Sequence, residues 1–419
     1  MNKLKNYKQL LALLLIGLLI HSCSEDVNDT LTSESDQNFV SKKLVKDVSN
    51  NFLFKNEQNN SLKGSKATYT NKSVKELVPV KNEKSKTVFY VINYDGGGFI
   101  ILSADNRTSP ILAYSETNNF SLDEESYPSG LVKWLTQTKK GIESVREKKT
   151  IQTKSQQLAW KRLNSQNKLH PDDLFGGEDE LNCEDDYEEI GPLLSTKWHQ
   201  RCGFNDLMPE LNCSNNLPCG RAYAGCVPIA IAQVMKFHEF PTTYNWDNMP
   251  NNYGTTTTSQ LIGDIHSAIT TTISGVDFPA VSYDCDGTGV SHDYNIANVF
   301  TNGFSYATAN RGDYNKETVK QYLRWNKPVI LSGGRDAGWW IFNAYTDGHM
   351  WVCDGFRRYF IWSEDCSTGS GYLFLHMNWG WGDNLINGWY GFNDFSPGDF
   401  TFNYDVKMIY NISSYNMTP

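Results

Sequence analysis

Apolar and polar positions in the first half of the chain follow helical and strand periods. Residues 39–53 carry apolar side chains about every four positions, and a second such stripe follows Pro128, so both segments are predicted to be helices. Between them, residues 87–94 and 99–102 are β-branched and aromatic and are separated by an Asp-Gly-Gly-Gly turn, which predicts a hairpin. Together these elements predict a small α+β domain over residues 38–149.

The second half shows helical periods first and strand periods later. Helices are predicted over 227–238, 261–269 and 316–325. Strands are predicted over 328–331, 349–354, 372–378, 389–392 and 406–410. Helices followed by an antiparallel sheet are typical of an α+β fold, and we assign residues 192–419 to one large domain.

A polar segment, residues 150–191, separates these two regions. Ten carboxylates occur within residues 171–189, and few apolar residues accompany them. Because like charges repel and little apolar surface is present to bury, we expect a solvated linker that a protease can cut.

Composition narrows the class of protein. Lys and Arg number 38 and Asp and Glu 47, a formal net charge of −9, which argues against a nucleic-acid partner because such proteins present a basic surface. Aromatic residues make up 13% of the chain, enough for a large core, so global disorder is excluded.

The N-terminus predicts export from the cytoplasm. Three lysines precede an apolar run over residues 10–20, which is shorter than the ~20 residues of a membrane-spanning helix and fits a signal peptide over residues 1–22. Ser22-Cys23 followed by Ser24-Glu25-Asp26 resembles the lipidation site and surface-export signal of Bacteroidota lipoproteins. We therefore expect lipidation of Cys23 and a tether over residues 23–37. The protein is expected in the cell envelope or outside the cell, as an outer-membrane lipoprotein that can be exposed at the surface. The alternative is a cleaved signal with an incidental Cys23.

The chain has nine cysteines, and outside the cytoplasm some of them should pair. Cys202, Cys213 and Cys219 lie close in sequence, and a Cys353–Cys366 bond would close the base of one hairpin, but spacing alone does not give the connectivity. A zinc site of His199 with the first three cysteines lacks the tight paired spacing of such sites, so no metal is expected.

Cys226 is the candidate nucleophile. It stands directly before a helical pattern, where the positive end of the helix dipole lowers a thiol pKa and favours the thiolate. Gly225 before it allows a sharp turn and a close approach of substrate. The alternative reading is a buried small residue or half of a disulfide.

A thiolate nucleophile needs a base, and His349 is the candidate. It lies between Gly348 and a predicted strand, and it would form the thiolate–imidazolium pair with Cys226 and later protonate the leaving amine. His376 is the only serious competitor for this role.

Three further residues would complete the site. Asn378 can accept a hydrogen bond from the ring N–H of His349 while Trp379 shields that bond from water. The Gln200 side chain and the Cys226 backbone N–H could both donate to the developing oxyanion.

The order Gln, Cys, His, Asn, Trp matches papain-like cysteine peptidases, and the local sequence resembles the streptopain family. The motifs that carry the resemblance are Pro192–Trp198 with Gln200, Gly225-Cys226-Val227 with Ala230–His238 and Pro241, Gly348-His349 with Asp354-Gly355, and Asn378-Trp379-Gly380-Trp381-Gly382. Residues 359–371 lengthen the stretch between His349 and Asn378 relative to the family pattern.

The resemblance implies a two-lobed papain-like peptidase domain behind an inhibitory prodomain over residues 38–149. It assigns Cys226 as nucleophile, His349 as base and acid, Gln200 as oxyanion donor, and Asn378 and Trp379 as groups that orient and shield His349. The implied protein is a secreted or surface-tethered cysteine endopeptidase made as a zymogen. Its partners would be protein or peptide substrates and its own prodomain, and no cofactor would be needed.

Two alternatives stay open at this point. One is a catalytically inactive surface lipoprotein whose aromatic residues bind a glycan or a host protein. The other is an inactive homologue in which a disulfide locks Cys226. If Cys23 is lipidated and Cys226 is free, seven cysteines remain, so at least one further thiol must be unpaired.

Overall fold

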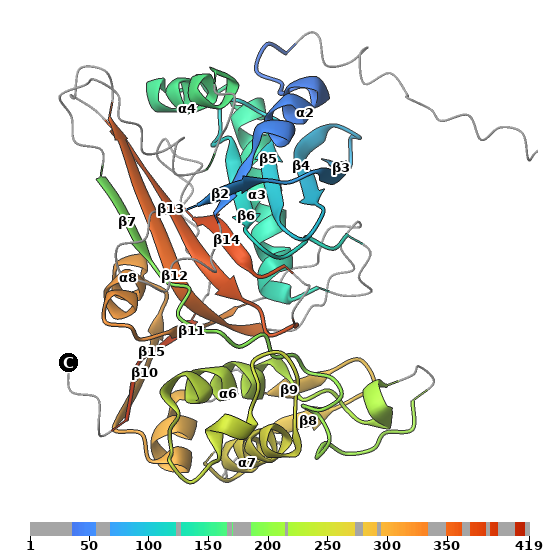
Figure 1. The fold of residues 1–419 in the computed structure, drawn as a ribbon, viewed down its shortest axis with the longest axis vertical. Coiled ribbons are helices and arrows are strands. Elements are labelled where there is room, and N and C mark those ends of the chain that lie inside the picture. Colours follow the sequence, from blue (N-terminus) through green and yellow to red (C-terminus); the bar gives the residue numbers. More distant parts are fainter. Residues whose placement is uncertain are drawn as a thin grey trace, which may run out of the picture. The chain divides into compact units, whose positions relative to one another are not determined.

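Figure 1 shows the fold in a computed structural model of the chain. The structure describes residues 36–55, 68–122, 127–165, 170, 186–213, 217–272, 280–290, 295–333, 349–362, 369–382, 386–392 and 407–414. The chain divides into two units, residues 1–39 and 40–419, and the elements below belong to the second. The predicted signal peptide, Cys23 and most of the tether lie outside the described residues.

The N-terminal region is a sheet covered by helices. Its elements are α2 (Lys42–Asn51), β1 (Leu53–Lys55), β2 (Tyr69–Asn71), β3 (Val74–Lys81), β4 (Thr87–Tyr94), β5 (Phe99–Ser103), β6 (Ile111–Ser115) and α3 (Ser129–Glu147). Helix α2 begins at Ser41, whose hydroxyl accepts the Leu44 N–H at 3.3 Å and so satisfies one free donor of the first turn. Every residue of β4 is buried, and α3 packs against the sheet. The predicted hairpin and the helix after Pro128 are therefore confirmed.

The segment predicted to be a solvated linker is partly structured, so that expectation is wrong at both of its ends. Helix α4 (Lys154–Ser165) buries Ala159, Trp160 and Leu163, and the Trp160 indole N–H donates to the Thr108 carbonyl at 2.8 Å. Strand β7 (Asp186–Ile190) pairs with a strand of the C-terminal sheet, residues 349–362. Three apolar side chains were enough to fold α4 against the N-terminal region; residues 171–185 lie outside the described part of the chain.

One lobe of the C-terminal region is mainly helical. Its elements are η2 (Pro218–Gly220), α6 (Cys226–His238), η3 (Trp246–Asn248), α7 (Thr256–Thr272), β8 (Val281–Tyr283), β9 (Thr288–Val290) and η4 (Val299–Gly303). Nine consecutive residues of α6 are buried, from Val227 to Met235, so this helix is enclosed on all sides. It joins α7 in a second core, which also takes in side chains of β11, β12 and β15. The two helices lie below the β12–β13 hairpin in Figure 1.

The other lobe is an antiparallel sheet with one covering helix. Its elements are β10 (Thr308–Asp313), α8 (Lys316–Arg324), β11 (Val329–Gly333), β12 (His349–Trp362), β13 (Gly369–Asn378), β14 (Gly388–Phe392) and β15 (Lys407–Ser413). The stretch 359–371, which lengthens this part of the chain relative to the family pattern, includes the end of β12 and the start of β13, and it supplies two of the five partners of β7, Tyr359 and Phe360.

The two regions share one sheet. The strand order among the described residues is β10-β15-β11-β12-β13-β14-β6-β5-β4-β3, so the step from β14 to β6 joins the C-terminal region to the N-terminal region. Trp389 lies opposite Tyr114, and Tyr390 opposite Ala113. Side chains from both regions also form a single apolar core. The N-terminal region therefore extends the C-terminal sheet at β14, an edge that would otherwise be open.

Among the residues that the structure describes, two disulfides join cysteines of the helical lobe, Cys202 to Cys219 and Cys213 to Cys285. Cys202, Cys213 and Cys219, the three cysteines considered above as zinc ligands, are therefore all in disulfides. The proposed Cys353–Cys366 staple is wrong, because Cys353 is a free, buried thiol on β12. Disulfides of this kind are typical of proteins from oxidising compartments. None of the helices that the structure describes has the length and apolar character required to cross a bilayer.

Candidate active site

Cys226 opens α6 and faces a pocket of about 160 Å³. Gly225 before it has a φ of +86°, a conformation that residues with a Cβ rarely adopt, and a Cβ there would lie 3.3 Å from the Thr288 side chain. Cys226 is free and partly buried, so the reading in which a disulfide locks it is wrong. Together with the unpaired Cys353, this agrees with the count of at least one further free thiol.

The thiol pKa shifts in the direction opposite to the one predicted from the helix terminus alone. Burial raises the pKa of Cys226, although backbone N–H groups at Met350, Val227 and Cys226 itself favour the thiolate. The helix start thus acts as expected, but loss of water around the sulfur outweighs it in this state of the protein.

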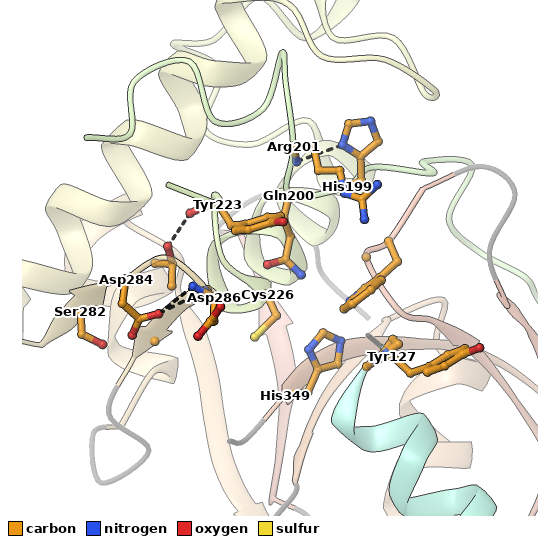
Figure 2. Close-up of a pocket in the computed structure, with 16 residues that line it drawn as sticks. Tyr127, His199, Gln200, Arg201, Tyr223, Cys226, Ser282, Asp284, Asp286 and His349 are labelled. Atoms are coloured by element: carbon orange, nitrogen blue, oxygen red, sulfur yellow. Dashed lines mark hydrogen bonds between the residues drawn. The ribbon is translucent and has the colours of Figure 1, made fainter. Parts of the chain in front are cut away.

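His349 lines the same pocket from the first position of β12. Its Nε2 lies 3.0 Å from the Trp379 carbonyl oxygen, which can only accept, so Nε2 carries the hydrogen and Nδ1 is left with a lone pair. Figure 2 shows one ring nitrogen of His349 on the side that faces the Cys226 sulfur. Burial lowers the pKa of His349 to about 4, with the Trp379 carbonyl opposing the shift. A neutral imidazole therefore stands beside a neutral thiol.

Three tryptophans surround the His349 ring. Trp351 is nearly parallel to it, at a centroid distance of 6.1 Å and an angle of 12°, and Trp381 meets it edge-on at 6.4 Å. Trp379 was expected to shield a hydrogen bond between Asn378 and His349 from water, and its side chain instead packs on Trp351 at 5.1 Å. Sequence reasoning missed Trp351, although its place two residues after His349 on a strand puts both side chains on one face.

The hydrogen bonds that the structure gives for Asn378 go to residues other than His349, contrary to the expectation. Its Oδ1 accepts from Gln233 Nε2 at 3.3 Å and from the Gly380 N–H at 3.2 Å, and its Nδ2 donates to the Thr196 carbonyl at 2.8 Å. The group that accepts from the histidine is instead the backbone carbonyl of the next residue. Asn378 thus holds the shape of the turn that presents this carbonyl.

Gln200 lies where an oxyanion donor is needed. It lines the pocket, and Figure 2 shows its side-chain amide above the Cys226 thiol. The backbone carbonyl of Gln200 accepts the Ala224 N–H at 2.9 Å. This bond joins the segment around Gln200 to the residues just before Cys226. The first N–H groups of α6 have no acceptor within the helix, so the Cys226 N–H and the Gln200 amide are two donors that an oxyanion in the pocket could accept from.

His376, the competing base, has a different place. Its Nδ1 lies 2.6 Å from Asp354 Oδ1, and it is not among the residues that line the pocket. The other carboxylate oxygen of Asp354 accepts the Leu194 N–H at 3.0 Å. The pair fastens the start of the peptidase domain to the sheet and has no contact with the thiol.

The N-terminal region reaches the pocket itself. Tyr127 and Pro128, at the start of α3, line it together with Cys226 and His349. The next glycine, Gly130, lies so close to the tryptophans that a Cβ would be 2.6 Å from Trp351 and 2.8 Å from Trp379. The sequence places a helix start here but gives no sign that it would contact the site.

The opposite wall is the β8–β9 hairpin, which brings Asp284 and Asp286 to the pocket and is anchored by the Cys213–Cys285 disulfide. Among the described residues, no group of three or more His, Cys, Asp or Glu side chains is arranged to hold a metal ion. The site is thus a thiol, an imidazole and amide donors around one cavity, a set suited to acyl transfer through a thioester.

Comparisons with known proteins agree with this chemistry. The Spi protease inhibitor family matches residues 37–142, and the Peptidase C10 family matches residues 198–243 and 242–390. Streptopain of Streptococcus pyogenes serotype M1 is 24% identical over 95% of this chain and 94% of its own length. The thiol protease/hemagglutinin PrtT of Porphyromonas gingivalis is also 24% identical; the alignment covers 75% of this chain but only 35% of that longer protein.

A solved structure supports the fold. The prointerpain A fragment of Prevotella intermedia superposes with a TM-score of 0.50 at 21% identity, covering 80% of this chain and 97% of that fragment. The predicted α+β architecture, an inhibitory prodomain followed by a cysteine peptidase domain, is confirmed. The chain belongs to the Peptidase C10 family, the streptopain family of cysteine peptidases, and carries a Spi-type inhibitory propeptide that makes it a zymogen.

Proposed function

We propose that this protein is an exported endopeptidase in which Cys226 attacks the substrate carbonyl and His349 transfers the protons. The observation that carries the assignment is that the free thiol of Cys226, the lone-pair nitrogen of His349 and the amide of Gln200 all line one pocket. Asn378 and Trp379 support His349 through the backbone turn rather than through side-chain contact with the ring.

The reaction follows from these positions. Nδ1 of His349 takes the thiol proton, and the Cys226 sulfur adds to the carbonyl carbon of the scissile bond. The Gln200 amide and the Cys226 N–H stabilise the oxyanion that forms. His349 then gives its proton to the leaving amine, which leaves a thioester, and water activated by the same imidazole hydrolyses it.

The inhibited state explains why both reacting groups are neutral in the structure. Tyr127 and Pro128 of the propeptide line the pocket, and burial both raises the Cys226 pKa and lowers the His349 pKa. Removal of the propeptide admits water, which favours the thiolate–imidazolium pair. We assign residues 38–149 to the prodomain, 150–191 to the region where maturation cuts, and 192–419 to the peptidase domain.

Export and anchoring form the second part of the proposal. The disulfides favour an oxidising compartment, and the N-terminal sequence favours a signal peptide over residues 1–22 with lipidation at Cys23. We expect Cys23→Ala to release the protein from the membrane fraction while leaving its specific activity unchanged. Unaltered membrane partition of that variant would contradict the anchor.

The test of the catalytic assignment is labelling of the purified protein with a thiol-reactive peptidase inhibitor under reductant, followed by intact mass and peptide mapping. We expect one adduct on Cys226, loss of casein hydrolysis, and neither adduct nor hydrolysis in Cys226→Ala. Cys353 serves as the internal comparison, because it is also a free thiol but is buried. Hydrolysis that persists in Cys226→Ala would refute the assignment.

A further inference from the structure

Gln233 is a polar residue in the interior of the helical lobe. It lies on α6, seven residues and about two turns after Cys226, and its side chain is fully buried. The residues around it on α6, from Val227 to Met235, are otherwise apolar and buried. An amide in such a place costs free energy unless its hydrogen bonds are satisfied, so its partners show what it is there to hold.

Both ends of the Gln233 amide are bonded, and to different segments. Its Nε2 donates to Asn378 Oδ1 at 3.3 Å, and its Oε1 accepts the Trp198 N–H at 3.4 Å. Asn378 is 145 positions away in the sequence and Trp198 is 35 positions away. One side chain thus joins the nucleophile helix to two other strips of the site.

The first bond leads to the base. Asn378 Oδ1 also accepts the Gly380 N–H at 3.2 Å, so Gln233 and Gly380 together fix the orientation of the Asn378 side chain across its own turn. Trp379 lies between these two residues, and its carbonyl accepts from His349 Nε2 at 3.0 Å. The orientation of that carbonyl decides which nitrogen of His349 carries the hydrogen and which is free to take the thiol proton.

The second bond leads to the oxyanion donor. Trp198 is two residues before Gln200 and is itself fully buried, with its indole N–H donating to the Pro250 carbonyl at 2.8 Å. The Gln233–Trp198 bond therefore sets where the segment Trp198–Gln200, which we call the oxyanion strip, lies along α6. The position of this strip in turn sets the distance between the Gln200 amide and the thiol.

We propose that Gln233 is a positioning residue that holds the histidine-bearing turn and the oxyanion strip in register with the nucleophile helix. This inference rests on the function proposed above. Gln233 does not line the pocket, so its loss should lower kcat and leave KM nearly unchanged. Removing the hydrogen-bond partner that orients a metal-ligating histidine commonly costs about 10- to 100-fold in activity, and by analogy we expect a loss of this size in kcat.

The experiment uses two variants, each expressed as the full chain and matured before assay. Gln233→Met keeps the length and apolar packing of the side chain but removes both hydrogen bonds. Gln233→Glu keeps the acceptor for Trp198, and its protonated form restores the donor to Asn378. Gln260→Met is the control, because Gln260 is exposed on α7 and bonds only Asp264 among the contacts described.

The pH profile separates positioning from simple packing. Burial raises the pKa of a carboxyl at position 233, so the Glu variant donates at low pH and loses its donor as pH rises through that pKa. We expect its kcat relative to wild type to be near one at about pH 5 and to fall toward about pH 8. The Met variant should show the same low ratio throughout this range.

The number of active sites is normalised by titration of Cys226 with the inhibitor, and folding is checked by thermal melting. A Gln233→Met kcat within twofold of wild type, or a Gln233→Glu kcat equally impaired at every pH, would overturn the proposal. If Gln233→Met does not fold, the Gln233→Glu profile decides alone. A wild-type protein that neither hydrolyses casein nor reacts at Cys226 would instead refute the proposed function.

Discussion

Glu116 of the propeptide is buried at the junction with the peptidase domain, where its negative charge lies beside the positive charge of the buried Arg357. Its carboxylate lies 3.3 Å from Nη1 of Arg357 on β12, 3.3 Å from His170 Nε2 and 2.9 Å from the Lys55 N–H. Arg357 is also buried and has a second carboxylate partner, Glu189, at 2.9 Å. Because Glu116 leaves with the propeptide, replacing it changes the zymogen but not the mature enzyme.

The effect of Glu116→Gln can be worked out from these contacts. The amide has one acceptor oxygen, which we expect to stay with the Lys55 N–H of the propeptide, so its NH₂ group faces Arg357 and the hydrogen bond between propeptide and peptidase domain is lost. A hydrogen bond to a charged group contributes about 1.5–3 kcal/mol. Glu189 still neutralises Arg357, so the larger cost of an unpaired buried charge does not apply. At 1.4 kcal/mol per tenfold, propeptide dissociation should become about 10- to 150-fold more favourable.

The assay is the rate at which Cys226 reacts with a neutral alkylating reagent in the full-length protein. If the propeptide opens and closes faster than the reagent reacts, this rate follows the open population and rises by the same factor. Intact mass separates full-length from processed chains, so only the zymogen is scored. Glu147→Gln is the matched control, because Glu147 is an exposed glutamate of α3.

A labelling rate for Glu116→Gln within twofold of wild type would refute the reasoning, because it would mean that the shared apolar core and the β14–β6 pairing hold the propeptide without help from the charges. An equal increase in Glu147→Gln would point to net charge rather than to the Arg357 contact.

Three further outcomes are expected. Gly130→Val should drive α3 off Trp379, at a cost of about 1–3 kcal/mol, and accelerate activation of the zymogen; unchanged activation would mean that α3 shifts freely. His349→Ala should lower kcat/KM of the matured enzyme by at least about 10²-fold, whereas His376→Ala should spare kcat and lower the melting temperature, and the reverse result would exchange their roles. Burial lowers the pKa values of His266 and His349 to about 4, so the unfolded state binds more protons between about pH 6.5 and 4. Zymogen stability should therefore fall as pH drops through this window, by up to about 1.4 kcal/mol per histidine per pH unit; chemical denaturation across the range that shows no loss would contradict the neutral buried imidazoles.

The sequence predicted individual elements well because local spacing and termini determine them. The strand predicted over 87–94 is β4, and the helix predicted over 227–238 is α6 with one residue added. The prediction of a solvated linker was wrong where a few apolar residues in a polar stretch pack against the rest of the protein, as in α4. Composition describes the average of a segment, whereas folding depends on which side chains reach a partner.

The residue types of the active site were predictable from their order, but their contacts were not. The sequence by itself determined that a thiol at a helix start, an imidazole at a strand start and amide donors would occur in one domain. The residue type decides the chemistry of each group, and the local pattern of apolar and polar residues decides whether it begins a helix or a strand. The tertiary structure alone decided that Asn378 binds Gln233 instead of His349, that β6 extends the peptidase sheet, and that burial outweighs the helix dipole at Cys226. These depend on contacts between residues far apart in the sequence, and on the water that those contacts exclude.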